Sequence, residues 1–383
     1  MNAIKLLLVA FLTIGTIAVT GCTEKDNEKP AQTENNENGG ENGGENGGEN
    51  GGENGGENGG ENGGETGEEN STVDIPEPGS VEAFEGALNG LFSVSATSQV
   101  RFSQGNLQWS AAGTHECADG STQNGTWRFA EHQWDTVGRV SNNKIASNYE
   151  GWIDLFCYAT SGWSGSGASE YMPYSIYWNR EYYLYTQDLT GEYAYADWGV
   201  YNAIYNGGNL PNRWRTLSKD EWNYLLGERH CSTVGGVADA RYCSALVCGM
   251  AGVILFPDYY QHPATVATPK YFNTTYIQGM DDGITINAVN EELPDGARYD
   301  GDAWAAMEAA GAVFLPYGGC RLHDENNRTG GVGYSGWYWT SSHFEVLEQG
   351  AAYSVWLSGS QIQVIHAGME ITSRGCSVRL VLK

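Results

Sequence analysis

Cysteine and histidine are the residue types of this chain best suited to nucleophilic and metal chemistry. The 383 residues include eight cysteines and seven histidines. Their spacing matches no zinc site, no His-Glu-x-x-His metalloprotease motif and no Gly-x-Ser-x-Gly nucleophile turn. Cys243 and Cys248 are close enough in sequence to form a local disulfide, whereas the pairing of the others cannot be read from spacing. We therefore predict no metal site, no cofactor and no catalytic residues.

Acidic residues offer a second route to chemistry. Residues 281–283 and 324–327 are rich in the carboxylate and amide oxygens that Ca²⁺ prefers. Each is also a short polar run that suits a solvated turn, which is the interpretation we favour. The paired carboxylates of a glycosidase can lie far apart in a chain and leave no motif. An exported enzyme that acts on carbohydrate therefore stays open as an alternative to a protein without catalysis.

Cys22 lies in a setting unlike that of the other cysteines. Lys5 precedes an apolar run of 14 residues, 6–19, which is too short to span a bilayer but suits the hydrophobic region of a signal peptide. Small residues come directly before Cys22, an arrangement that resembles a bacterial lipobox. The resemblance implies that residues 1–21 are a lipoprotein signal peptide and that Cys22 is lipidated, palmitate being one such lipid. An ordinary secretory peptide that contains a cysteine is the alternative.

Acidic residues follow this cysteine. Glu24, Asp26 and Glu28 resemble the surface-export signal of Bacteroidetes lipoproteins. That resemblance implies an outer-membrane, lipid-anchored protein exposed at the cell surface, with an anchor that faces the periplasm as the alternative. The membrane would be contacted through the lipid anchor only.

Residues 22–82 hold few of the apolar side chains that a folded core needs. A Glu-Asn-Gly-Gly unit repeats seven times from Glu37 to Gly64, and residues 23–82 carry 17 acidic against 2 basic side chains. Such a segment buries too little to repay the entropy of ordering, and its charges repel one another. We predict a disordered tether.

Aromatic residues mark the start of a different region. All 13 tryptophans and all 23 tyrosines lie beyond Phe84, so we predict one globular domain over residues 83–383. The chain carries a formal net charge of −27, and the globular part is itself acidic, with 30 acidic and 17 basic side chains. Since no basic field attracts phosphate, a nucleic-acid partner is excluded.

Short alternating stretches separated by glycine and asparagine predict a β-rich domain. A hairpin is expected from residues 91–94 and 100–103. Further strands are expected at residues 105–109, 126–129, 152–156, 338–342, 352–357, 361–364 and 375–382.

Two main helices complete the α+β pattern. Ser218 and Glu221 form a capping box, and a buried stripe follows at Trp222, Leu225 and Leu226.

The second helix is expected at residues 302–310, where Gly311 can end it in the left-handed region. An apolar run at residues 312–316 follows this helix and predicts a central strand. A similar run at residues 253–257 follows the first helix.

Seven strings resemble, in their order and spacing, Bacteroidetes surface lipoproteins with a C-type-lectin-like fold. They are residues 105–107, 126–131, 197–199, 214–222, 311–316, 338–342 and 377–381. Such proteins include Fibrobacter major paralogous domain proteins and targets of diversity-generating retroelements, and formylglycine-generating, sulfatase-modifying enzymes share the fold. The resemblance implies a C-type-lectin-like domain whose last strands present a broad ligand-binding surface. It also implies that residues 377–381 form a closing core strand.

The sequence departs from two relatives in this group. Retroelement variation acts on Asn codons, yet no Asn occurs from Trp337 to Lys383, which favours a fixed binding surface. Formylglycine-generating enzymes bind copper through two C-terminal cysteines. The residues around Cys320 and Cys376 do not reproduce those motifs, so we interpret both as buried residues in strands.

Strand alternation selects the ligand-facing residues. Tyr353, Val355 and Leu357 share one face of their strand, and Ser354 and Trp356 share the other. With the aliphatic face toward the core, Ser354 and Trp356 point to solvent. Together with the implied use of the last strands, this alternation predicts a ligand-binding surface of eleven residues: Trp337, His343, Phe344, Glu345, Ser354, Trp356, Gln361, Gln363, His366, Met369 and Glu370.

Trp356 is the residue that we expect to contribute most. A tryptophan on the solvent side of a strand exposes a large apolar area unless a partner covers it. The alternative is that Trp356 packs under a neighbouring loop. The leading hypothesis is a surface adhesin that binds an external protein or glycan without catalysis. An exported enzyme and an envelope structural component are the alternatives.

Overall fold

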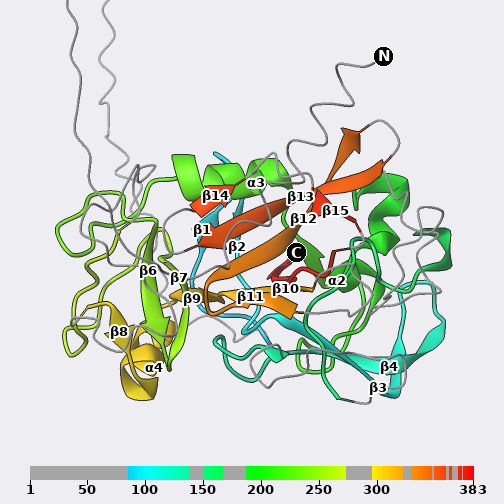
Figure 1. Ribbon diagram of the computed structural model, residues 1–383, viewed down its shortest axis with the longest axis horizontal. Coiled ribbons are helices and arrows are strands. Elements are labelled where there is room, and N and C mark those ends of the chain that lie inside the picture. The colour runs from blue at the N-terminus through cyan, green and yellow to red at the C-terminus, as the bar shows by residue number, and fades with distance from the viewer. Residues whose placement is uncertain are drawn as a thin grey trace, which may run out of the picture. The chain divides into compact units, whose positions relative to one another are not determined.

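The computed structural model describes residues 85–137, 151–166, 187–272, 296–321, 329–346, 349–358, 362–364, 370–372 and 374–383. These residues form several small sheets and a few short helices, so the β-rich α+β class predicted from the sequence is confirmed (Figure 1).

The alternating C-terminal residues form the largest sheet among the described residues. Its strand order is β11 (Thr329–Val332), β10 (Gly318–Arg321), β12 (Ser335–Val346), β13 (Gln349–Ser358) and β14 (Ile362–Val364), with β15 (Glu370–Ile371) also paired to β13. The pairing is antiparallel except between β10 and β12. The strands predicted at residues 338–342 and 352–357 lie in β12 and β13, and residues 362–364 of the third predicted strand form β14.

A second, four-stranded sheet has the order β8 (Arg298–Tyr299), β6 (Tyr242–Val247), β7 (Met250–Leu255) and β9 (Val313–Pro316). The apolar run at residues 312–316 therefore forms a strand, but an edge strand, and the prediction of a central strand was wrong. β9 is nevertheless buried because side chains cover its open edge. Gln133 Oε1 accepts a 2.7 Å hydrogen bond from the backbone N–H of Phe314 and another of 2.7 Å from Arg379 Nη2.

Three strand pairs complete the β structure of the part of the chain that the structure describes. β1 (Phe92–Ser93) pairs with β2 (Gln99–Val100), β3 (Leu107–Glu116) with β4 (Thr122–Phe129), and β5 (Trp214–Thr216) with β16 (Leu380–Leu382). The first two confirm the predicted hairpin and the strands at residues 105–109 and 126–129. Residues 152–156 instead make isolated bridges, through Ile153 to Trp109 and through Phe156 to Cys376.

The helices among the described residues are short. They are the 3₁₀ turns η3 (Ser164–Ser166) and η5 (Gly191–Ala196), α2 (Trp198–Tyr201), α3 (Lys219–Asn223), which continues as the π-helical turn η6 (Tyr224–Glu228), and α4 (Gly301–Ala309). α4 begins one residue earlier than predicted because Asp300 caps it, accepting a hydrogen bond from Ala303 N–H. Gly311 follows at φ +93°, as the helix end requires.

α3 begins with the predicted capping box. Ser218 Oγ accepts from Glu221 N–H at 3.2 Å, and Glu221 Oε2 accepts from Ser218 N–H at 2.8 Å. Both hydrogen bonds satisfy backbone donors that the helix itself cannot pair.

Replacing Ser218 with alanine should lower the free energy of unfolding by about 1 kcal/mol, as expected for loss of an N-cap acceptor. Urea unfolding of the full-length chain measures this change. Ser218→Thr keeps a hydroxyl in the same place and should retain most of the stability. Equal stability of Ser218→Ala and the wild type would show that the cap contributes nothing here.

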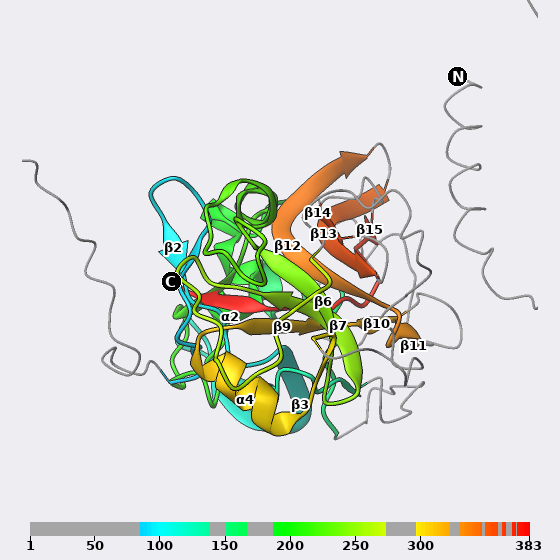
Figure 2. The same ribbon diagram turned by 90° about the vertical axis from the view of Figure 1, so that its left-hand side faces the viewer.

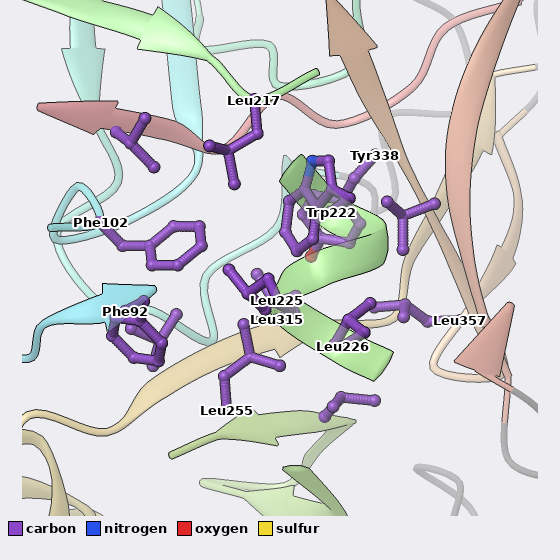
Figure 3. Packing of buried hydrophobic residues seen from close by; sticks show 14 of the residues in the cluster. Phe92, Phe102, Leu217, Trp222, Leu225, Leu226, Leu255, Leu315, Tyr338 and Leu357 are labelled. Carbon is purple, nitrogen blue, oxygen red and sulfur yellow. The ribbon is translucent and has the colours of Figure 1, made fainter. Parts of the chain in front are cut away.

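The predicted apolar stripe of the first helix is buried in a shared core. Trp222, Leu225 and Leu226 pack with Phe92 and Phe102 of the N-terminal hairpin region and with residues of β7, β9, β12 and β13 (Figure 3). A second cluster lies around Trp127, Trp198 and Trp339. A third joins α4 to the four-stranded sheet through Trp304 and Phe314, whose ring centres are 5.7 Å apart; Figure 2 shows α4 beside β9.

The C-terminal segment closes the structure against the N-terminal part of the described chain. Residues 377–381 are all buried, which confirms that they belong to the core. The predicted continuous closing strand is not formed, because β16 covers only Leu380–Leu382 and Ser377 makes an isolated bridge to Tyr338. Val381 bridges to Phe102, and Leu107 N–H donates to Val378 O at 2.9 Å.

No disulfide joins the seven cysteines beyond Cys22, all of which lie among the described residues. Cys243 is opposite Ile254 in the β6–β7 hairpin, whereas Cys248 lies in the turn at φ +48°, so the local disulfide considered for this pair is not formed. Cys320 and Cys376 are buried as predicted, and their segments are adjacent through a bridge from Arg321 to Gly375.

Candidate functional site

The ladder between β12 and β13 places Trp337 directly opposite Trp356. The two rings stack, with centres 6.3 Å apart and planes inclined by 24°. Both side chains are half-buried. Gln363 on β14 is the register neighbour of Trp356 on the other side. Three of the predicted site residues therefore come together at one end of this ladder.

Tyr334 is a further aromatic residue at the Trp337–Trp356 end of the ladder. It lies in the turn from β11 to β12, where its backbone N–H donates to Gly331 O at 2.9 Å, and its side chain is 53% exposed. Gly331 allows Trp337 to approach, because a Cβ at this glycine would lie only 3.3 Å from the indole ring. The glycine also has φ +78°, a conformation that disfavours other residues.

Ser354 does not face solvent, so this part of the predicted surface was wrong. Its side chain is only 2% exposed. Ser354 is paired with Trp339, which packs in the cluster around Trp127 and donates its indole N–H to Phe156 O at 2.7 Å. The alternation itself was correct, since Val355 and Leu357 are buried on the opposite face. The sheet is covered on both faces at Ser354, whereas the Trp337–Trp356 end of the second face is partly open.

A second group of predicted residues lies near the other end of the ladder. His343 and Phe344 are on β12, and Glu345 and Glu370 occupy register positions beside them on β12 and β15. A bulge in β12 lies between the two groups. On the facing strand their register partners, Trp356 and Ala352, are four residues apart, which corresponds to about 13 Å. The predicted residues therefore fall into two groups along the ladder.

His343 is held by an acidic residue from a distant part of the chain. Asp188 Oδ1 accepts the backbone N–H of His343 at 2.8 Å and lies 2.7 Å from the ring Nδ1. Phe344 meets Tyr353 edge to face at 5.3 Å, and Lys219 Nζ lies 4.8 Å from the centre of the Tyr353 ring. Sequence reasoning missed Asp188 and Lys219 because neither stands near the last strands in the sequence.

Four predicted residues lie outside the described part of the chain. They are Gln361, His366, Met369 and the lipidation residue Cys22. For Glu345, Gln363 and Glu370 the structure gives the strand position alone.

Two buried carboxyl groups have a raised pKa, and both accept hydrogen bonds from backbone N–H groups. Burial raises the pKa of Asp154 and of Asp197 to about 6. Asp197 Oδ1 accepts from Gly199 N–H at the start of α2, and its Oδ2 accepts from Thr216 N–H. Asp154 Oδ2 accepts from Val137 N–H at 2.9 Å. These hydrogen bonds hold loop segments in place. The two carboxyl groups are not arranged as an acid–base pair.

Across the residues that the structure describes, no three or more His, Cys, Asp or Glu side chains gather in a metal-binding arrangement. None of the helices in that same part is long and apolar enough to cross a bilayer.

No family model, no curated protein and no solved structure matches this chain. The stacked tryptophans form a fixed aromatic surface, and the His343–Asp188 pair forms a separate polar group.

Proposed function

We propose that this chain is a non-catalytic cell-surface lipoprotein that binds an external protein or glycan through its C-terminal strands. The stacked pair Trp337–Trp356 is the observation that carries the proposal. Binding energy in protein interfaces concentrates in a few aromatic or Arg residues with well-packed surroundings. A pair of half-buried tryptophans on two adjacent strands has this character.

The stack prepares these side chains for binding. Each indole has two side-chain torsions, and contact with its neighbour restricts them before a ligand arrives. Aromatic pairs contribute about 0.5–1.5 kcal/mol beyond the area they bury. A ligand that covers the pair therefore loses little entropy in ordering it, and this favours a rigid contact surface.

The finer fold assignment belongs to the same proposal. The last strands supply the largest sheet of the described residues, and its longest ladder carries the tryptophan pair. This architecture supports a C-type-lectin-like domain in which the C-terminal strands present the ligand surface.

Surface display follows from the N-terminal sequence. We predict that Cys22 is acylated, since an apolar run and small residues precede it. Changing Cys22 to serine should move the protein from the membrane fraction to the soluble fraction and abolish labelling by an alkyne palmitate analogue. Unchanged partitioning and labelling of the variant would contradict the lipoprotein assignment.

A glycan and host-protein array probed with the full-length chain tests the function. We expect selective binding to a small set of glycans or proteins, and loss of that binding when Trp337 and Trp356 are both changed to alanine. Absence of any selective binder, or selective binding that the double variant retains, would overturn the proposal.

A further inference from the structure

A cleft of about 580 Å³ opens on the outer side of the β3–β4 hairpin. Ligand sites in proteins commonly have volumes of about 300–1,000 Å³. Its walls include β3, β4, Trp152 and the segment that carries Tyr205 and Asn206. None of the eleven residues of the predicted ligand-binding surface lines this cleft, so the cleft is not part of that surface.

The register of three segments explains why polar residues and one tryptophan share this outer face. On β3 and β4, Trp109 pairs with Trp127, and both are buried in the core. Alternation therefore turns the flanking pair Gln108–Arg128 to the outer face. Trp109 also pairs with Ile153, which sets the neighbouring Trp152 beside the hairpin on that outer side.

Arg128 is fixed in place by two contacts. Its guanidinium carbon lies 3.8 Å from the centre of a Trp152 ring, a close cation–π stack. Its Nε donates to Gln108 Oε1 at 3.0 Å. Neither contact uses the two Nη atoms, which form the fork that binds carboxylates with two parallel hydrogen bonds. Burial lowers the pKa of Arg128 from its ordinary value, but an arginine still carries its charge at neutral pH.

The other walls offer groups suited to a sugar ring. Gln104, Ser110 and Thr114 supply amide and hydroxyl groups. Tyr205 is 68% exposed, so one of its ring faces can accept the apolar side of a pyranose. Glu131 also lines the cleft and is exposed. Its negative charge should weaken the binding of an anion in this cleft.

We propose that this cleft binds a sugar that carries a carboxylate, a hexuronic acid. Its carboxylate would accept two hydrogen bonds from the Arg128 Nη fork, its ring would lie on Tyr205, and its hydroxyls would meet the polar wall. The site is separate from the Trp337–Trp356 surface, and neither proposal depends on the other.

Saturation-transfer NMR of the full-length chain in detergent micelles, titrated with methyl glucuronide and methyl glucoside, tests this site. We expect the glucuronide to bind at least tenfold more tightly than the neutral glucoside. Arg128→Gln should weaken glucuronide binding at least tenfold. Glu131→Gln should tighten it, because a like charge is removed from the cleft.

Tyr205 gives a variant that is safe for folding, since its side chain is largely exposed. Tyr205→Ala should weaken glucuronide binding severalfold. Tyr259→Ala, which removes a tyrosine that is 50% exposed elsewhere on the molecule, should leave it unchanged. The proposal is overturned if the glucuronide does not bind, if both sugars bind equally, if Glu131→Gln weakens binding, or if Tyr205→Ala has no effect.

Discussion

Replacing Asp258 with alanine should lower the free energy of unfolding by about 3–5 kcal/mol, the usual cost of leaving a buried charge without its partner. Asp258 Oδ1 lies 2.8 Å from Arg229 Nη1, and the two side chains are 6% and 0% exposed. Removal of the carboxylate leaves the Arg229 charge buried and uncompensated. The same substitution removes the acceptor of three hydrogen bonds from the first hairpin. Asp258 Oδ2 accepts them from Ser93 N–H, Ser93 Oγ and Gln99 Nε2.

Asp220 provides the matched control for this prediction. Its carboxylate lies 3.8 Å from Lys219 Nζ, but the Asp220 side chain is 86% exposed. An exposed ion pair contributes about 0–1 kcal/mol, so Asp220→Ala should change the stability little. Urea unfolding of the full-length variants compares the two. A loss in Asp258→Ala no larger than that in Asp220→Ala would show that the buried pair does not stabilise the fold.

Replacing Trp356 with alanine should weaken ligand binding by about 2 kcal/mol or more, which is roughly thirtyfold in Kd. The variant loses both its own contact surface and the stack that orders Trp337. The variant should remain folded, although the broken stack removes about 0.5–1.5 kcal/mol and the lost buried area of this partly buried side chain adds to that loss. The affinity for a ligand identified by the array and the melting temperature measure the two effects.

Tyr259→Ala again gives the control, because it removes a half-exposed aromatic ring from another part of the molecule. It should leave both the affinity and the melting temperature close to those of the wild type. If Trp356→Ala unfolds the domain while the remaining folded fraction binds normally, Trp356 is a core residue and the surface must be redrawn.

Local patterns in the sequence predicted the elements well. The capping box at Ser218 and Glu221 formed as expected, because both of its hydrogen bonds are set by residues three apart. The same holds for the end of α4 at Gly311, where one backbone conformation decides the outcome. Alternation correctly buried Val355 and Leu357.

The features that the sequence did not predict depend on contacts between residues far apart in the chain. Alternation shows that Ser354 and Val355 face opposite sides, but not that Ser354 is buried beside Trp339, whose indole N–H is held by Phe156 O. An apolar run likewise predicts that β9 is buried. It does not reveal that Gln133, 181 residues earlier, satisfies the open edge of that strand.

The candidate site shows the same difference between local features, which the sequence predicts, and long-range contacts, which it does not. Sequence reasoning placed Trp337 and Trp356 in one predicted ligand-binding surface, and their direct pairing required the register of the β12–β13 hairpin. The partner of His343 could not be found from the sequence, since Asp188 stands 155 residues away from it. Arg128 and Trp152 also lie in different segments, and only their stacked geometry marks the cleft.

Hydroxyl-radical footprinting of the full-length chain tests the central claim most directly. The labelling of each side chain is compared between the free chain and the chain saturated with a protein or glycan from the array. We predict that Trp337 and Trp356 become protected, while labelling of Tyr259 stays the same. Unchanged labelling of both tryptophans in a saturated complex, with protection elsewhere on the molecule, would contradict a ligand surface on the C-terminal strands.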